Sequence, residues 1–275
     1  MSDERLAALR RTIEQLLPAV AGVLALKRGP AGIVAPYLFV PQRPDEVAEL
    51  ALWPKEPLPS VLRLLQRAHP EARLALVCRG CEERGVVEMA KHAQINLDQV
   101  ELIGLQCTSA EAEFCRCARP YTRHAKTVVG QKVAGVADAL TDAFATKSQA
   151  EKLAFWKEQF SYCLKCYGCR NICPQCFCNV CTLEDEQWVE TGRLPLPRPS
   201  MYHLIRAMHM TAKCVACREC EETCPAGIPL AIHFRLMARD VQTMFGYEPG
   251  VEREQLPPQL LTLEEGEFER TGLPH

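Results

Sequence analysis

The sequence predicts an α/β domain followed by an all-α domain, and two features of the chain lead to this interpretation. In the first half, short apolar runs bounded by glycine or proline alternate with stretches of helical periodicity. In the second half, two dense cysteine motifs are flanked by helical patterns. The predicted boundaries are an α/β domain over 1–135, an all-α domain over 136–250 and an acidic C-terminal tail over 251–275.

The α/β prediction depends on a strand–helix–strand order along the chain. Two parallel strands need a long crossover, usually a helix, so this order predicts a parallel sheet. Strands are expected at 20–26, 32–40, 73–78 and 100–107, and helices at 4–17, 45–52, 60–69 and 81–93. In the second half, helices are expected at about 136–160, 200–213 and 228–245.

Composition limits the functional class. The net charge of −2 gives no basic field for nucleic acid. The first residues, MSDERLAALRR, lack the apolar core of a secretory signal, and the run 16–26 is too short to span a bilayer. We therefore expect a cytoplasmic protein without a transmembrane segment. In a reducing compartment its sixteen cysteines indicate metal or redox chemistry rather than disulfides.

The strongest motif, C-x2-C-x2-C-x3-C-P, occurs twice. Three closely spaced cysteines wrap one [4Fe–4S] cluster, and the fourth, before proline, ligates the neighbouring cluster. Zinc sites use separated cysteine pairs instead, which argues against zinc. One cluster is therefore expected on Cys163, Cys166, Cys169 and Cys224, and the other on Cys214, Cys217, Cys220 and Cys173, with Pro174 and Pro225 after the fourth cysteines.

The helical stretches around these motifs carry a first resemblance. SMYHLIRAMHMTAK at 200–213 lies between the motifs, and IPLAIHFRLMARDVQTMF at 228–245 follows the second. Residues 155–245 resemble the α-helical ferredoxin domain of succinate dehydrogenase iron–sulfur subunits and heterodisulfide reductase subunits. The histidines here, His203, His209 and His233, are expected to pack or to face solvent. Arg206 and Arg218 either donate to cluster sulfurs or face solvent, and the sequence leaves this open.

A second group of cysteines follows the predicted strands of the first half. Ligands in α/β sheets bind at the carboxyl ends of strands, so thiols there can meet at one edge. A third cluster is expected on Cys81, Cys107, Cys115 and Cys117. A further metal site could use Cys176, Cys178, Cys181 and Cys78, and spare buried thiols explain these four equally well.

The N-terminal elements carry a second resemblance. RGCEERGVVEMAK at 79–91, the strand ending in Cys107, and the cysteine pair before TVVGQKVAG at 127–135 resemble the β subunits of deazaflavin-coenzyme-dependent hydrogenases and formate dehydrogenases. CYGCRNICPQCFCNVC at 166–181 and FGYEPG at 245–250 are similar to a ferredoxin-fused branch of that family. The cysteine pair reads C-x-C where the family has C-x2-C, which leaves the fourth ligand open between Cys115 and Cys78.

The resemblance also implies a flavin. Neither a G-x-G-x-x-G nor a phosphate-binding P-loop motif is present in the sequence. Arg79, directly after a predicted strand, is the candidate partner of an FAD phosphate, and a surface arginine is the alternative.

The sequence thus predicts an iron–sulfur electron-transfer subunit of a larger cytoplasmic oxidoreductase complex. It would relay electrons between a partner redox subunit, resembling a formate dehydrogenase, a hydrogenase or a heterodisulfide reductase, and another acceptor. One alternative is a flavin-containing reductase of a soluble deazaflavin or nicotinamide coenzyme, and another is an iron–sulfur redox sensor. No hydrolase or metalloprotease motif assigns a catalytic residue, and whether the chain is itself an enzyme stays open.

Overall fold

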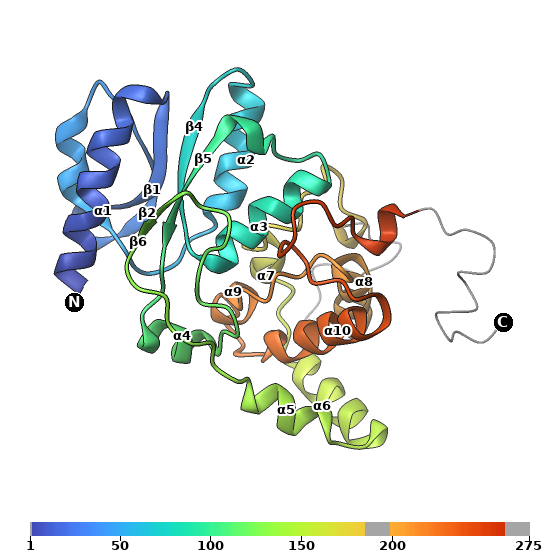
Figure 1. The fold of residues 1–275 in the computed structure, drawn as a ribbon. Helices are drawn as coiled ribbons and strands as arrows, with labels where there is room; N and C mark the ends of the chain where they lie inside the picture. The colour runs from blue at the N-terminus through green and yellow to red at the C-terminus, as the bar shows by residue number, and fades with distance from the viewer. Residues whose placement is uncertain (1, 185–198, 262–275) are drawn as a thin grey trace. The chain divides into compact units, whose positions relative to one another are not determined.

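The structure is a computed structural model that describes residues 2–184 and 199–261 (Figure 1). The chain divides into two compact units. Unit 1 contains Met1–Asp138 and Ile172–Pro174, and unit 2 contains Ala139–Asn171 and Gln175–His275. Each unit is described by itself. None of the helices in the described ranges has the length and apolar character needed to cross a membrane.

Unit 1 is built on a mixed sheet of six strands. Their order is β2-β1-β4-β5-β6, and the short β3 also pairs with β1. The pairs β1–β4, β4–β5 and β5–β6 are parallel, whereas β2 and β3 run antiparallel to β1. The strands are β1 (Gly22–Arg28), β2 (Val34–Phe39), β3 (Leu50–Ala51), β4 (Leu74–Cys78), β5 (Val100–Leu105) and β6 (Thr127–Val129).

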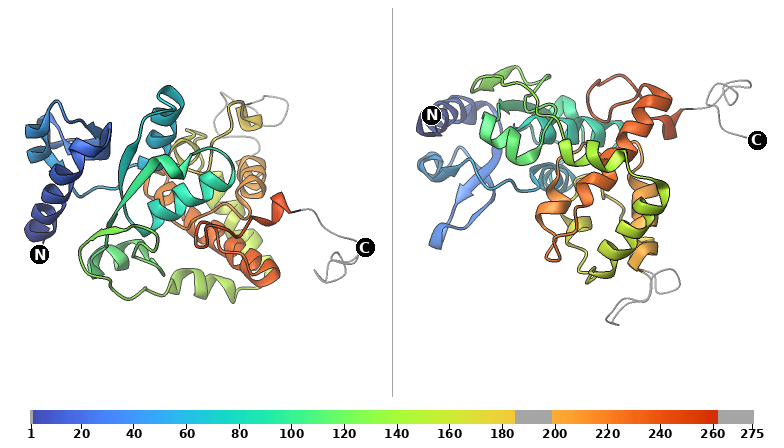
Figure 2. Two further views of the ribbon diagram at one scale, coloured as in Figure 1. Left: turned by 45° about the horizontal axis from the view of Figure 1, so that its top comes forward. Right: turned by 90° about the horizontal axis from the view of Figure 1, so that it is seen from below.

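Helices cover both faces of this sheet (Figures 1 and 2). Helix α1 (Ser2–Leu16) lies on one face, where its Leu9 and Ile13 join a core with alternate strand residues such as Ala75 and Val77. Helices α2 (Leu58–Ala68) and α3 (Gly80–Lys91) pack against the strands from the other face. The remaining elements are η1 (Leu17–Ala19), η2 (Pro30–Gly32), η3 (Pro44–Glu49), η4 (Leu97–Gln99) and α4 (Ser109–Cys115).

Most predicted elements of unit 1 are confirmed, and three predictions are corrected. The predicted helix at 45–52 is the 3₁₀ helix η3 followed by the short strand β3. The predicted parallel sheet is mixed, because β2 returns antiparallel beside β1 through a short connection that needs no crossover. Helix α4 and strand β6 were not expected, and Cys115 is the last residue of α4.

The described part of unit 2 consists of helices and irregular segments. Helix α6 packs against α8, α10 packs against α5, α8 and α9, and α7 packs against α9. Aromatic side chains of α5, α6, α8 and α10 form a cluster around Trp156 and Phe160. The helices are α5 (Ala139–Ala145), α6 (Gln149–Ser161), α7 (Gly168–Asn171), α8 (Pro199–Met210), α9 (Glu219–Glu222) and α10 (Leu230–Phe245), with η5 (Thr182–Glu184) and η6 (Pro258–Leu260).

The fold class predicted for the second half was wrong. A self-contained all-α ferredoxin domain would hold both cysteine motifs, but the end of the first motif groups with the α/β unit. Its segment Ile172–Pro174 belongs to unit 1, where the Pro174 ring lies 3.7 Å from the place of a Cβ on Gly85 of α3. The predicted domain boundaries stay predictions, and residues 262–275 of the predicted tail lie outside the described residues.

A buried carboxylate of α3 holds the segment 119–125 of unit 1 against the start of this helix. Glu83, which is 2% exposed, accepts hydrogen bonds from the backbone N–H groups of Arg123 (2.6 Å), His124 (2.9 Å) and Ala125 (2.8 Å). The segment approaches the backbone so closely that a Cβ on Gly80 would lie 2.3 Å from the Tyr121 carbonyl oxygen. The segment is therefore fixed by one charged acceptor and by a glycine that leaves it room.

Replacing Glu83 should therefore destabilise unit 1. The Glu83→Ala variant leaves three backbone amides without their charged acceptor, and we expect a loss of about 3 kcal/mol, or roughly 10 °C in Tm. Thermal unfolding of the anaerobically purified chain, followed by circular dichroism, measures this. The exposed Glu113 of α4 provides the control, since Glu113→Ala should keep the parent Tm. Equal Tm values for the two variants would contradict the role given to Glu83.

Candidate metal centres

The clearest candidate site lies in unit 2, where four cysteines line one pocket. Cys163, Cys166 and Cys169 come from the first motif, and Cys224 comes from the end of the second. Burial raises the pKa of Cys163, and the neighbouring Cys169, Cys224 and Cys166 thiols act in the same direction. The structure thus brings together the four residues that the motif spacing predicts as one ligand set, and their binding of a cluster stays a prediction.

The two cysteine runs share one backbone conformation. The residues before and after the second cysteine have positive φ in both: Lys165 (50°) and Tyr167 (59°) in the first run, Ala216 (56°) and Arg218 (70°) in the second. A short helix follows each pair, α7 and α9. Non-glycine residues seldom adopt this conformation, so its repetition indicates a structural requirement. In the first run it lets the Lys165 N–H donate to Cys163 Sγ at 3.4 Å.

The surroundings of the pocket fit an anionic cluster. Arg206 of α8 is 2% exposed and donates to the Cys169 carbonyl at 2.8 Å, and Lys165 is also buried. Four thiolates around a cubane carry net negative charge, which buried cations stabilise. Arg206 therefore lies inside the protein beside the pocket, whereas Arg218 pairs with Glu221 and Glu222.

The cysteines of the described ranges are all free thiols. None of the sixteen cysteines, all of which lie in the described ranges, forms a disulfide. Across residues 2–184 and 199–261, no three histidine, cysteine, aspartate or glutamate side chains are arranged to share a single metal ion. Each thiolate of a cubane binds a different iron atom, so the four sulfurs lie further apart than the ligands of a single metal ion. The pocket of Cys163, Cys166, Cys169 and Cys224 is a candidate site for a cluster of this kind.

The second predicted ligand set is divided between the units. Cys220 is buried in α9, and Cys214 and Cys217 are half-buried beside it in the same run. Their predicted fourth ligand, Cys173, belongs to unit 1. This ligand set therefore stays a prediction.

In unit 1, three of the predicted cysteines lie close together. Cys81 is in the first turn of α3, Cys107 follows β5, and Cys117 follows α4. Burial raises the pKa of Cys107, and the nearby Cys81 and Cys117 thiols raise it further. Burial likewise raises the pKa of Cys81 to about 12, with Glu82 and Cys117 acting in the same direction. These mutual effects place the three thiols around a common region.

The fourth ligand in unit 1 remains open between two cysteines. Cys115 ends α4 and is half-buried. Cys78 ends β4 and is fully buried, and this burial, with Glu83 and Glu82 nearby, raises its pKa. Either thiol is next to the Cys81, Cys107 and Cys117 group along the chain, so both stay candidates.

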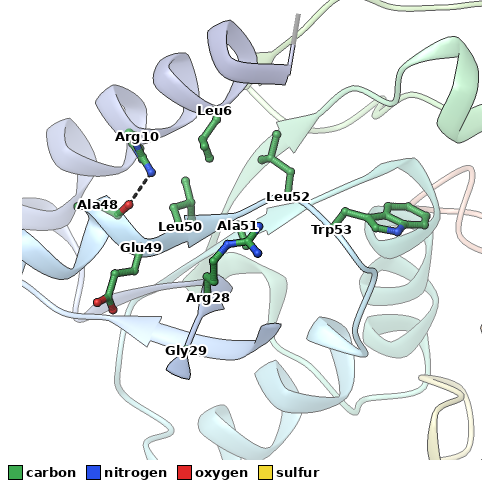
Figure 3. A pocket seen from close by; sticks show the side chains of 10 residues that line it. All are labelled: Leu6, Arg10, Arg28, Gly29, Ala48, Glu49, Leu50, Ala51, Leu52 and Trp53. Atoms are coloured by element: carbon green, nitrogen blue, oxygen red, sulfur yellow. Dashed lines mark hydrogen bonds between the residues drawn. The ribbon is translucent and has the colours of Figure 1, made fainter. Parts of the chain in front are cut away.

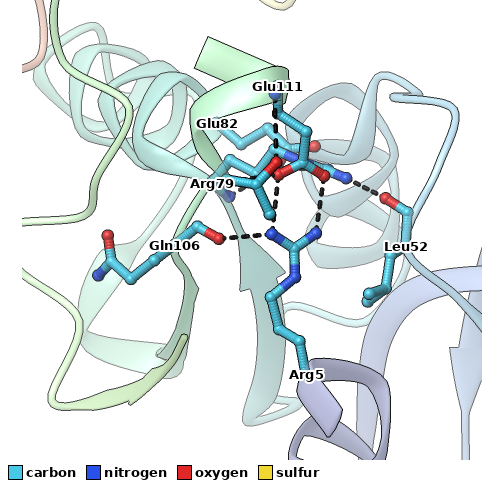
Figure 4. Close-up of polar contacts among 7 residues, drawn as sticks. Arg5, Leu52, Arg79, Glu82, Gln106 and Glu111 are labelled. Carbon is cyan, nitrogen blue, oxygen red and sulfur yellow. Dashed lines mark hydrogen bonds and ion pairs between the residues drawn. The ribbon is translucent and has the colours of Figure 1, made fainter. Parts of the chain in front are cut away.

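Arg79, the predicted flavin contact, is engaged within the protein (Figure 4). It is 2% exposed, donates to the Leu52 carbonyl, and lies 3.6 Å from the Glu82 carboxylate. Beside it, Arg5 of α1 donates two hydrogen bonds of 2.7 and 2.8 Å to the Glu111 carboxylate of α4. The contacts with Leu52 and Glu82 hold the Arg79 guanidinium inside the protein, and its binding of a flavin stays a prediction.

Unit 1 also contains an open pocket of about 580 Å³ (Figure 3). That volume falls in the range of small-molecule sites. Charged and apolar residues share the wall, the exposed Arg28 reaches into it, and Trp53 stands at one end. The lining residues are Leu6, Arg10, Arg28, Gly29, Ala48, Glu49, Leu50, Ala51, Leu52 and Trp53.

The three cysteines after the first motif have different neighbours. Cys176 Sγ lies 3.8 Å from Met210 Sδ, and Cys181 lies beside the Arg170 guanidinium. Cys178 is exposed. Cys78, proposed with them as a fourth ligand, belongs to unit 1. A further metal site on these four residues stays a prediction.

Two residues of α8, Tyr202 and His203, line the unit 2 pocket together with the four cysteines. Packing was expected for His203 but not its place in this pocket, and Tyr202 was not among the predicted site residues. Helical periodicity predicted that some residues of this stretch are buried, but it does not tell which element they face. The other two histidines differ, since His209 is exposed and His233 is half-buried beside Trp156.

Comparison with known proteins identifies relatives for part of the chain. No family model matches it. It is 39% identical over 133 residues to F420-dependent formate dehydrogenase subunit beta of Methanocaldococcus jannaschii, which is 47% of this chain and 35% of that protein. It is 43% identical over 105 residues to F420-dependent formate dehydrogenase 1 subunit beta of Methanococcus maripaludis, which is 38% of this chain and 26% of that protein.

The match thus spans about a third of the first relative and a quarter of the second. Identities of 39% and 43% over more than 100 residues show common descent of the matched parts. Over the matched residues, the chain is a relative of the β subunits of F420-dependent formate dehydrogenases.

Proposed function

We propose that the chain is an iron–sulfur electron-transfer subunit of an oxidoreductase complex. The observation that carries this proposal is the pocket where Cys163, Cys166 and Cys169 meet Cys224 from the other motif. A [4Fe–4S] cluster, when bound, supplies a one-electron carrier. The relatives are named as formate dehydrogenase subunits, which supports partner subunits for this chain as well.

The residues of the pocket have separate tasks. The four thiolates hold the cluster, and apolar residues such as Ile228 and Leu230 exclude water from it. Arg206 and the Lys165 N–H place positive charge and a donor beside the thiolates. Burial and hydrogen bonding of this kind set the reduction potential of a cluster.

The chain would form one part of a longer relay. The cysteines of unit 1, Cys81, Cys107 and Cys117 with Cys115 or Cys78, would hold a third centre. The partner redox subunit would be of formate dehydrogenase, hydrogenase or heterodisulfide reductase type, and the cytoplasmic location inferred from cysteine usage stays a prediction.

The pocket of Figure 3 favours a second candidate function. A flavin-containing reductase of a soluble deazaflavin or nicotinamide coenzyme needs space for a flat ring and a cation for its phosphates. Trp53 offers an aromatic surface, and Arg28 offers an exposed guanidinium. In this function Arg28, rather than the engaged Arg79, would pair with a flavin phosphate.

The ligand sets can be tested by replacing single cysteines of the two motifs with alanine. We expect Cys163→Ala and Cys224→Ala to remove the same centre, with a loss of about four iron atoms per chain, because both thiols belong to one pocket. Cys214→Ala should remove a different centre. Iron and sulfide are quantified in anaerobic preparations, and EPR spectra of the reduced chains identify the centre that is lost.

Two results would contradict the proposal. In the first, Cys224→Ala removes the signal that Cys214→Ala removes, and Cys163→Ala removes another. In the second, the intact anaerobic chain contains substantially fewer than about eight iron atoms.

A third centre in unit 1 would depend on Cys107. The Cys107→Ala variant should contain about four iron atoms fewer than the parent chain and keep the EPR signals of the other two centres. Glu113→Ala, an exposed change in the neighbouring α4, should keep the full iron content. An unchanged iron content in Cys107→Ala would exclude a centre at this position.

The flavin function predicts direct binding to the Figure 3 pocket. Adding FAD to the full chain should quench Trp53 fluorescence, and Arg28→Ala should raise the Kd about tenfold because a charge-assisted contact to phosphate is lost. The Trp53→Phe variant shows whether the quenched signal comes from this residue. Quenching that persists in Trp53→Phe, or equal Kd values for Arg28→Ala and the parent, would place the flavin elsewhere or exclude it.

A further inference from the structure

The pocket of Cys163, Cys166, Cys169 and Cys224 contains two polar aromatic side chains that no ligand set uses. Tyr202 and His203 are consecutive residues of α8, and each is 1% exposed. Both line the pocket with the four cysteines. Two groups capable of hydrogen bonding are thus removed from water and placed beside thiols.

The hydroxyl of Tyr202 is directed at one of these thiols. The Tyr202 oxygen and Cys169 Sγ are 3.7 Å apart and form a hydrogen bond. A phenolic hydroxyl carries one O–H donor, so at this position it is available as a donor to a thiolate.

His203 is held rigidly but lacks hydrogen bonds. Its ring stacks on Phe160, with centroids 4.1 Å apart and planes 10° from parallel. Neither Nδ1 nor Nε2 has a hydrogen-bond partner among the described residues. Burial lowers the pKa of His203 to about 3, and Arg206 and His233 act in the same direction. The ring is therefore a neutral imidazole with one N–H and one acceptor nitrogen.

A buried polar group without a partner is rare, because its desolvation is not compensated. Stacking alone does not explain the choice of histidine, since a phenylalanine would stack on Phe160 without that cost. The partner is therefore expected in what the pocket holds. Sulfide and thiolate sulfurs of a cluster are acceptors, which matches an N–H and an O–H lining the same wall.

We propose that Tyr202 and His203 donate hydrogen bonds to the cluster held by Cys163, Cys166, Cys169 and Cys224, and that they raise its reduction potential. This inference rests on the proposed function. When the cluster gains one electron, its sulfurs become more negative. A fixed hydrogen-bond donor therefore stabilises the reduced cluster more than the oxidised cluster. The two side chains act as positioning and tuning residues rather than as ligands.

The test uses three matched variants of the full chain, purified anaerobically. Tyr202→Phe removes only the hydroxyl, and His203→Phe keeps an aromatic ring on Phe160 while it removes the N–H. His209→Phe makes the same change at an exposed position of the same helix. The centre is recognised as the EPR signal that Cys163→Ala abolishes, and its reduced fraction is measured during a potentiometric titration.

The ratio of reduced to oxidised centre is compared at a fixed potential near the midpoint of the parent chain. It should fall about tenfold in Tyr202→Phe and in His203→Phe, because each variant loses one hydrogen bond to a charged acceptor. It should stay unchanged in His209→Phe. Electron–nuclear double resonance after exchange into D₂O should show fewer exchangeable protons coupled to this centre in both donor variants. A purely structural role would not remove those couplings.

The outcomes separate the inference from the proposed function. If the parent chain lacks this centre, the proposed function itself is overturned. If Tyr202→Phe and His203→Phe keep the full iron content, the ratio of reduced to oxidised centre and the proton couplings of the parent chain, the inference alone is overturned. If His203→Phe fails to retain iron at this centre, the reduced fraction and the proton couplings are measured in His203→Gln and Tyr202→Phe instead. Loss of the centre in all three, with His209→Phe intact, would assign the pair a structural role and also overturn the inference.

Discussion

The parallel pairing of β4 with β5 is the constraint on which the arrangement of the N-terminal cysteines depends. In this register Cys78 lies opposite Gly104, so the chain leaves both strands at the same edge of the sheet. Cys81 then falls in the first turn of α3, and Cys107 lies two residues past β5. The segment that carries Cys117 reaches this edge because the Cys107 N–H donates to the Pro120 carbonyl at 3.1 Å.

Unit 2 gathers its thiols by a different device. Both of its cysteine runs contain a pair of residues with positive φ, and in the first run Cys163, Cys166 and Cys169 line one pocket. The fourth thiol of the pocket, Cys224, lies beyond α9, and α9 packs against α7 of the first run. The pocket therefore depends on tertiary contact between the two runs, whereas the edge in unit 1 depends on strand register.

Much of this could be predicted from the sequence, and the failures have physical reasons. Long periodic runs gave α1, α3, α10 and the strands β1, β4 and β5 correctly. The stretch 45–52 is too short for its pattern to separate a 3₁₀ helix from an α-helix. Helix α4 has a start signal in the sequence, since Thr108 and Glu111 form a capping box. The mixed sheet and the pairing of His203 with a cysteine pocket arise from tertiary contacts, which no local pattern contains.

The segment Ile172–Pro174 has a consequence for the order in which the chain becomes structured. It belongs to unit 1, although it follows a stretch that belongs to unit 2. Chains emerge from the ribosome from the N-terminus, and early domains can fold before later ones are made. Here unit 1 is complete only after residue 174 has been synthesised, so the first three cysteines of the first motif emerge before their neighbouring domain can finish folding. A contiguous fragment that begins after residue 138 would likewise take three residues away from unit 1, and the two units cannot be separated by a single cut.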